Sequence, residues 1–191
     1  MADTQKNNKR EPEVAVIIGR FQPYHNGHKA IVDYALDNYD YVVILLGSSY
    51  QPRSKKNPWT WQERTDMILS AHPKDEGRIY VLPVADNPDD DLWVSSVKSL
   101  VSTAAPPQSR ITLVGVRSDE TSFYLDLFPE WALEELESSG FRHATEIRED
   151  YFSREPSFET RVERDVPLTT LSRMQTILRG EEIDKLRAEN V

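Results

Sequence analysis

His25 and His28 stand three residues apart directly after an apolar stretch, at the start of a predicted helix. Side chains at this spacing share one side of a helical turn, so both imidazoles face the same way. The free N–H groups and the positive dipole end of a helix N-terminus favour a phosphate there. Arg20 precedes them, and its guanidinium can donate two parallel hydrogen bonds to phosphate. We therefore predict a phosphate site with His25, His28 and Arg20 as donors. The alternatives are a simple histidine cap and a surface arginine ion pair.

The elements that must position these side chains alternate between apolar runs and amphipathic segments. The alternation predicts an α/β protein with a Rossmann-like, doubly wound parallel sheet and C-terminal helices, with ligands at the carboxyl ends of the strands. The absence of a Gly-x-Gly-x-x-Gly fingerprint weighs against a dehydrogenase. We expect strands at 14–18, 41–46, 79–84, 111–115 and 141–147. We expect helices at 27–37, 92–101, 122–127, 171–179 and 181–190, and a further helix that begins at the Thr60–Glu63 capping box. Residues 150–165 are expected to be irregular. The first helix should bury Ile31, Tyr34 and Ala35, and the second Trp61, the Arg64 stem, Ile68 and Ala71.

Composition narrows the class of protein. The net charge of −9 argues against general nucleic-acid binding, and zero cysteines argue against a disulfide framework or a thiolate metal site. We find no signal segment and no membrane-spanning run, so the expected location is cytoplasmic, without a membrane partner. Residues 1–13 are polar and charged and are predicted to be a disordered extension before one domain at 14–191. The sequence leaves a homo-oligomer open.

The His25-Asn26-Gly27-His28 stretch resembles the His/Thr-x-Gly-His signature of the nucleotidylyltransferase superfamily. The preceding Gly19-Arg20-Phe21-Gln22-Pro23 resembles adenylyltransferases of nicotinamide mononucleotide (NMN), both the archaeal type and the bacterial ones fused to a Nudix domain. The resemblance is specific from Val14 to Trp131 and looser to Gly180. It implies transfer of AMP from Mg-ATP to NMN, which gives NAD and pyrophosphate. The Mg²⁺ would be carried by ATP, with no metal site of the protein's own.

Three further segments, 47–64, 84–94 and 115–131, resemble segments that contact nucleotides in this family. The first is a basic loop that closes over phosphates, although such a loop is more often only solvated. The second places Trp93 where the family stacks a tryptophan on the nicotinamide ring, although a tryptophan near a helix start is more often core. The resemblance implies an ATP site at Gly19, Arg20, Phe21, His25, His28, Lys56, Gly115, Asp119, Thr169 and Arg173. It implies an NMN site at Phe21, Ser48, Arg53, Asn57, Trp59, Arg64, Asn87 and Trp93.

The family's last motif, Ile-Ser-x-Thr-x-x-Arg at a helix start, gives a serine and an arginine to the ATP phosphates. We assign it to 168–174, where it is degraded because Met174 takes the arginine slot and Arg173 lies one residue early. We expect Thr169 or Thr170 and Arg173 still to contact ATP, and Met174→Arg to be tolerated. The alternative is that Arg173 faces solvent. No Nudix helix is present before Val191, so we do not expect hydrolysis of ADP-ribose unless the sequence is a fragment of a longer chain.

Two other functions compete with this hypothesis. One is a nucleotidylyltransferase with another acceptor: nicotinate mononucleotide, a phosphopantetheine precursor or a flavin. The other is a nucleotide sensor without turnover. Trp93 and the acidic turn at Asp86–Asp91 favour a pyridine nucleotide, but they do not distinguish the amide from the acid. Pyrophosphate release on mixing ATP with each acceptor separates these functions.

Overall fold

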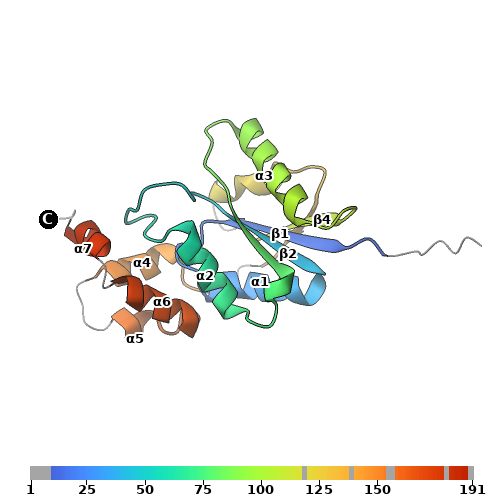
Figure 1. Cartoon of the computed structure of the whole chain (residues 1–191). Helices are drawn as coiled ribbons and strands as arrows, with labels where there is room; N and C mark the ends of the chain where they lie inside the picture. The colour runs from blue at the N-terminus through green and yellow to red at the C-terminus, as the bar shows by residue number, and fades with distance from the viewer. Residues whose placement is uncertain (1–9, 118–119, 138–139, 154–157, 179–180, 189–191) are drawn as a thin grey trace, which may run out of the picture.

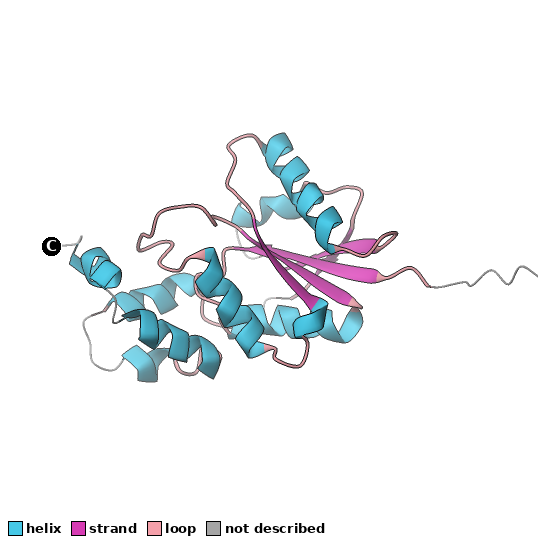
Figure 2. Cartoon of the chain, in the orientation of Figure 1, coloured by secondary structure: helices cyan, strands magenta, loops and turns pink. Residues whose placement is uncertain are grey.

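A five-stranded parallel sheet forms the centre of the computed structural model, which describes residues 10–117, 120–137, 140–153, 158–178 and 181–188 (Figures 1 and 2). The strand order is β3-β2-β1-β4-β5, and the predicted doubly wound α/β fold is confirmed. Most of the predicted N-terminal extension lies outside the described residues. The strands are β1 (Glu13–Gly19), β2 (Tyr41–Leu46), β3 (Ile79–Pro83), β4 (Arg110–Gly115) and β5 (Ala132–Glu135).

Helices cover both faces of the sheet, with α1 and α2 on one side and α3 on the other (Figure 1). The C-terminal helices pack beside the α1–α2 layer, where α6 contacts α2. In the described part of the chain, no helix has the length and apolar character needed to cross a membrane. The helices are α1 (Asn26–Asn38), α2 (Trp61–Ala71), α3 (Asp90–Ala104), α4 (Ala144–Phe152), α5 (Phe158–Val162), α6 (Leu168–Leu178) and α7 (Glu181–Ala188), with 3₁₀ turns η1 (Glu76–Arg78) and η2 (Glu120–Asp126).

Side chains of β1 alternate between the two helical layers. Ala15 and Ile17 join the core under α1 and α2, whereas Val14, Val16 and Ile18 join the core under α3. Because β1 is central and buried on both faces, its sequence is apolar from Val14 to Ile18, as expected for a parallel strand. Its carboxyl end, where the strand order reverses direction, is the switch point at which such sheets bind ligands.

The C-terminal part differs from the sequence-based expectation. The strand predicted at 141–147 is wrong, because this segment leads into α4, whose Ile147 and Tyr151 are both fully buried at the four-residue spacing of a helix. The fifth strand is β5, an exposed edge strand of sequence Ala-Leu-Glu-Glu. The region predicted to be irregular, 150–165, contains the end of α4 and all of α5.

The buried faces of the first two helices are also shifted. In α1 the buried residues are Val32, Ala35 and Leu36, rather than the predicted Ile31, Tyr34 and Ala35. The displaced pair, Ile31 and Tyr34, instead lines the cavity described below. In α2 the predicted burial of Arg64 and Ile68 is confirmed and Met67 is buried with them, whereas Trp61 and Ala71 are only partly buried.

Candidate active site

A cavity of about 730 Å³ lies at the carboxyl ends of β1 and β4. Its volume is within the range of small-molecule sites. Its walls come from the loop after β1, the start of α1, the loops after β2, β3 and β4, and the segment that leads into α4. The cavity brings together these predicted site residues: Gly19, Arg20, Phe21, His25, His28, Ser48, Asn87, Trp93 and Gly115.

The two histidines stack on each other at the start of α1. Their ring centroids lie 3.7 Å apart, with 29° between the ring planes. His25 is the N-cap residue, and its Nδ1 accepts a hydrogen bond of 3.1 Å from the N–H of Gly27. The Nδ1 of His28 accepts one of 3.4 Å from the N–H of His25. With both Nδ1 atoms acting as acceptors, the proton of each neutral ring is on Nε2.

Both imidazoles are held in the neutral form. Burial, and then the charge of His143, lower the pKa of His25 to about 4. Burial, and then His25, lower the pKa of His28, while a hydrogen bond to the Pro23 backbone acts in the opposite direction. A bound phosphate supplies the negative charge that favours protonation, so this pair is suited to respond to a polyphosphate.

An aromatic shelf supports the His28 ring. The Phe21 ring centroid lies 4.6 Å from that of His28, and Tyr24 stacks on His28 at 6.0 Å with 13° between the planes. A Cβ added at Gly19 would lie 3.1 Å from the Phe21 ring, so this close approach favours glycine. Phe21 and Ser48 have φ values of 51° and 49°, an uncommon conformation for residues other than glycine that occurs often at functional sites.

A polar chain that is buried at Tyr24 and His72 and partly exposed at Asp33 continues behind this shelf. The Tyr24 hydroxyl lies 2.6 Å from Nε2 of His72, and Nδ1 of His72 lies 3.4 Å from Oδ1 of Asp33. Burial raises the pKa of Tyr24, and burial lowers that of His72. The chain links α1 to the C-terminal end of α2 and fixes the ring on which His28 stacks.

The Arg64 side chain connects the loop after β1 to the loop after β2 through hydrogen bonds to both. It is fully buried and donates hydrogen bonds of 2.5 Å to the Arg20 carbonyl and 2.8 Å to the Gly47 carbonyl. Burial lowers its pKa to about 10. Its donors bind backbone carbonyls and the Ser49 hydroxyl, and Arg64, a predicted NMN contact, does not line the cavity.

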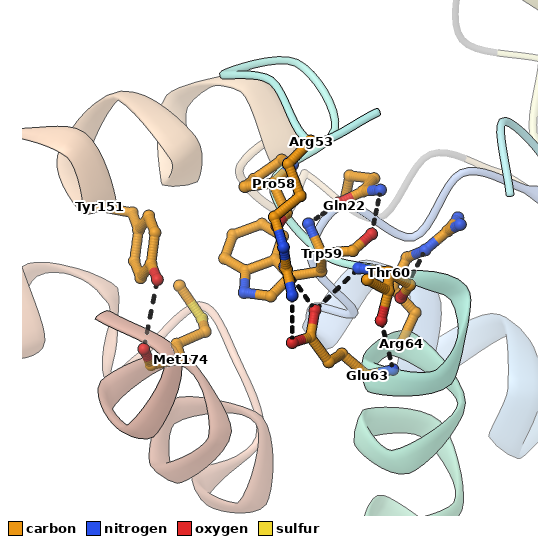
Figure 3. A network of polar contacts seen from close by, with 9 residues as sticks. All are labelled: Gln22, Arg53, Pro58, Trp59, Thr60, Glu63, Arg64, Tyr151 and Met174. Carbon is orange, nitrogen blue, oxygen red and sulfur yellow. Dashed lines mark hydrogen bonds and ion pairs between the residues drawn. The ribbon is translucent and has the colours of Figure 1, made fainter. Parts of the chain in front are cut away.

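The basic loop before α2 is held to its own helix (Figure 3). The guanidinium of Arg53 makes two hydrogen bonds with Glu63, of 2.7 and 2.8 Å, and one of 2.6 Å to the Pro58 carbonyl. Lys56 is exposed and Asn57 is half-buried. These three predicted ligand contacts, Arg53, Lys56 and Asn57, do not line the cavity.

Trp59 is a core residue. Its side chain is 1% exposed and lies 5.0 Å from the Tyr151 ring, between centroids. The Gln22 side chain bonds both the N–H and the carbonyl of Trp59, at 3.1 and 2.8 Å (Figure 3). The structure thus places Trp59 outside the predicted NMN site, because its ring fills the space between α2 and α4.

Residues 168–174 do not reach the cavity either. Thr169 is exposed, and Arg173 is 51% exposed and lies 3.9 Å from Asp66 on α2. Met174 is fully buried, and its carbonyl accepts a hydrogen bond from the Tyr151 hydroxyl at 3.3 Å. The burial of Met174 argues against the expectation that Met174→Arg is tolerated, because the new charge would lie in the core.

A better match to the family's last motif lies at 143–148. His143-Ala144-Thr145-Glu146-Ile147-Arg148 has the Thr-x-x-Arg spacing at a helix start, with His143 in the place of the serine. Arg148 is buried and donates 2.8 Å to the Gln22 carbonyl and 3.0 Å to the Thr145 hydroxyl. His143 lines the cavity. The Thr-x-x-Arg spacing can be read from the sequence, but the motif lies at a helix start, and the sequence pattern predicts a strand at 141–147.

The wall after β4 is closely packed. A Cβ added at Gly115 would lie 2.7 Å from the Leu125 side chain, so a side chain there would force Leu125 to move. The Tyr124 hydroxyl donates 3.1 Å to the Ile18 carbonyl and ties this wall to β1. Asp119, a predicted ATP contact, lies outside the described residues. Within the described ranges, no group of three or more His, Cys, Asp or Glu side chains is arranged to hold a metal ion.

Known proteins match both the sequence and the fold. The family described as Cytidylyltransferase-like matches residues 16–150. The nicotinamide/nicotinic acid mononucleotide adenylyltransferase of Acinetobacter baylyi is 42% identical over 139 residues, which are 72% of this chain and 74% of that protein. The nicotinamide-nucleotide adenylyltransferase of Ignicoccus hospitalis is 33% identical over 179 residues, which are 90% of this chain and 98% of that protein.

A solved structure of an NMN adenylyltransferase has a similar fold. The bifunctional NMN adenylyltransferase/ADP ribose pyrophosphatase of Francisella tularensis, complexed with AMP and a manganese ion, superposes with a TM-score of 0.78 at 26% identity. The match covers 94% of this chain and 53% of that one, so this chain spans about half the length of the bifunctional protein. The chain belongs to the cytidylyltransferase-like family and, within it, to the group of NMN adenylyltransferases.

Proposed function

We propose that this chain is a nicotinamide-nucleotide adenylyltransferase that makes NAD from Mg-ATP and NMN. The observation that carries the proposal is the stacked pair of His25 and His28 at the α1 N-terminus, inside a cavity at the carboxyl end of β1. The names of the relatives agree with it.

The reaction needs no covalent intermediate on the protein. A phosphate oxygen of NMN attacks the α-phosphorus of ATP, a new P–O bond forms, and the bond from the α-phosphorus to the bridging oxygen breaks. Pyrophosphate leaves with that electron pair, and Mg²⁺ enters as part of the Mg-ATP substrate. Catalysis then consists of alignment and stabilisation of the charge on the phosphates.

The cavity residues supply those two effects. His28 and His25 donate from Nε2 to the phosphates, and Arg20 adds a permanent positive charge beside them. Trp93 offers a flat face to the pyridinium ring, since stacking and cation–π attraction add. Gly115, at the end of β4, lines the part of the cavity in which the adenosine of ATP would lie. Divalent metal use is supported by the manganese ion in the Francisella tularensis structure.

Pyrophosphate release tests the proposal against other acceptors. The purified chain is mixed with Mg-ATP and, separately, with NMN, nicotinate mononucleotide, phosphopantetheine and flavin mononucleotide. We expect release with a pyridine mononucleotide and none with the other two, and EDTA should stop it. Release with phosphopantetheine or the flavin alone would assign another acceptor. Tight ATP binding without release from any acceptor would support a sensor.

A further inference from the structure

The start of α1 is held by a distant segment, the turn between α5 and α6. Asn26, the first residue of α1, donates a hydrogen bond of 2.8 Å from its N–H to the Asp165 carbonyl. Its side-chain amide donates a second one, also of 2.8 Å, to the Arg164 carbonyl. Asn26 lies between His25 and Gly27, which both line the cavity. Two successive carbonyls of the turn therefore fix the helix start that carries His25.

The same turn holds a second wall of the cavity through a side chain. The Asp165 carboxylate accepts a hydrogen bond of 2.8 Å from the Arg142 guanidinium, whose other terminal nitrogen donates 2.9 Å to Asp150. Arg142 lines the cavity and directly precedes His143, the N-cap residue of α4. Asp165 thus binds the residue after His25 with its carbonyl and the residue before His143 with its carboxylate.

The turn is a firm support for both contacts. The N–H groups of Asp165 and Val166 donate 2.9 and 3.2 Å to the Val162 carbonyl. Val162 is 0% exposed and Val166 is 2% exposed, and both belong to the core cluster that contains Tyr24 and Met67. The Asp165 side chain is 17% exposed, so its ion pair with Arg142 is better shielded from water than a surface pair.

The two walls joined by Asp165 also meet directly. A Cβ added at Gly27 would lie 3.4 Å from the Cβ of Phe141. Burial, and then the charge of His143, lower the pKa of His25, as expected for two imidazoles near each other. Because His25 begins α1 and His143 begins α4, their separation depends on contacts between these two elements.

We propose that Asp165 is a positioning residue for the ATP phosphates: through Arg142 it holds His143 at a fixed separation from His25. The inference rests on the proposed function, because it takes ATP to be the ligand between these imidazoles. Asp165 does not line the cavity, so its effect on ATP passes through Arg142 and His143. The rival interpretation is that Arg142 contacts ATP itself and that Asp165 is only its counter-ion.

Asp165→Ala tests the proposal, because it removes the carboxylate and keeps the carbonyl that binds Asn26. Calorimetry gives the Kd of Mg-ATP without turnover, and steady-state kinetics gives KM for ATP and for NMN. We expect Asp165→Ala to raise the Kd and KM for ATP about threefold and to leave KM for NMN within about twofold. The isosteric Asp165→Asn keeps an accepting oxygen for Arg142 and should show a smaller rise. Should Asp165→Ala fail to fold, Asp165→Asn carries the same comparison.

A double-mutant cycle separates positioning from a merely structural role. If Asp165 acts through His143, its removal should have no further effect on the Kd of Mg-ATP once His143 is alanine. The same rise in the His143→Ala background as in the wild type would overturn the proposal. A lower Kd in Asp165→Ala would also overturn it, because the ion pair would then withhold Arg142 from ATP.

Glu163→Ala is the matched control. It removes a carboxylate two residues away, and Glu163 is exposed and does not line the cavity. We expect its Kd and KM for ATP to equal those of the wild type, and melting temperatures confirm that each variant is folded. A rise in Glu163→Ala equal to that in Asp165→Ala would overturn the proposal. Absence of NAD formation by a wild type that binds Mg-ATP would instead overturn the proposed function, whereas the Kd comparison would still decide the role of Asp165.

Discussion

The imidazole of His25 stacks on that of His28 with 3.7 Å between ring centroids, and each ring accepts a backbone hydrogen bond at Nδ1. This arrangement leaves both Nε2 atoms with the proton at neutral pH and disfavours a charge on either ring. The pair is therefore a neutral donor until a polyanion binds.

The stability of the free protein should fall in acid because of this pair. The pKa of His25 is lowered from 6.5 to about 4. Between pH 4 and pH 6.5, His25 is therefore protonated in the unfolded chain but neutral in the native state. The free energy of unfolding should thus decrease as pH falls from about 6.5 to 4, by about 1.4 kcal/mol per pH unit for this one group. Urea unfolding from pH 5 to 8 measures it. His25→Asn keeps a good cap and should flatten the slope; an unchanged slope would contradict the assignment.

The last phosphate contact should come from α4 rather than from α6. His143→Ala should raise KM for ATP several-fold, because His143 lines the cavity. Arg173→Ala should leave KM for ATP within about twofold, because Arg173 is solvent-facing and only near Asp66, a type of pair that contributes little. Steady-state kinetics with NMN saturating measures both. A larger rise in KM for ATP in Arg173→Ala than in His143→Ala would instead assign the phosphate-binding motif to 168–174.

Met174→Arg should destabilise the protein by about 3 kcal/mol or more, since it buries a charge between α6 and α4. Met174→Leu is the matched control and should cost under about 1.5 kcal/mol. Chemical unfolding of the two variants compares them. If the arginine variant were as stable as the leucine variant, Met174 would not lie in the core.

Trp93→Ala should raise KM for NMN much more than KM for ATP, since Trp93 lines the cavity and its flat ring can stack on the cationic pyridinium ring of NMN. Trp93 also lies 6.0 Å from the Phe128 ring, so some loss of stability is expected as well. Trp93→Phe keeps a flat ring and should recover most of the NMN affinity. A rise in KM for ATP alone would place the adenine, and not the pyridine, on this ring.

The sequence predicts the centre of the molecule better than its edge. β1 and β2 are central strands buried on both faces, so their unbroken apolar runs identify them. β5 is an edge strand with two glutamates and mostly exposed side chains, so it carries no such signal. α4 escapes detection because its sequence is mostly polar, and its buried face is marked by only two apolar residues, Ile147 and Tyr151, four residues apart.

Local spacing likewise predicts only part of the site. His25 and His28 come from one helical turn, so their spacing is enough to bring them together. The burial of Trp59 and Arg64 depends on contacts that no local pattern shows. Trp59 packs on Tyr151 from a distant segment, and Arg64 bonds the carbonyls of two different loops. The resemblance marks the loop before α2 as a segment that contacts nucleotides in the family, but the fold decides which of its side chains line the cavity.

NAD formation from Mg-ATP and NMN, compared between the wild type and His28→Ala, tests the central claim most directly. The wild type should form NAD and pyrophosphate in equal amounts. His28→Ala should lower kcat by ~10²–10³-fold, the usual effect of removing one donor that stabilises charge in the transition state. NMN binding, measured by calorimetry, and the melting temperature should change little. A kcat near that of the wild type, in a folded His28→Ala variant that still binds both substrates, would contradict the account.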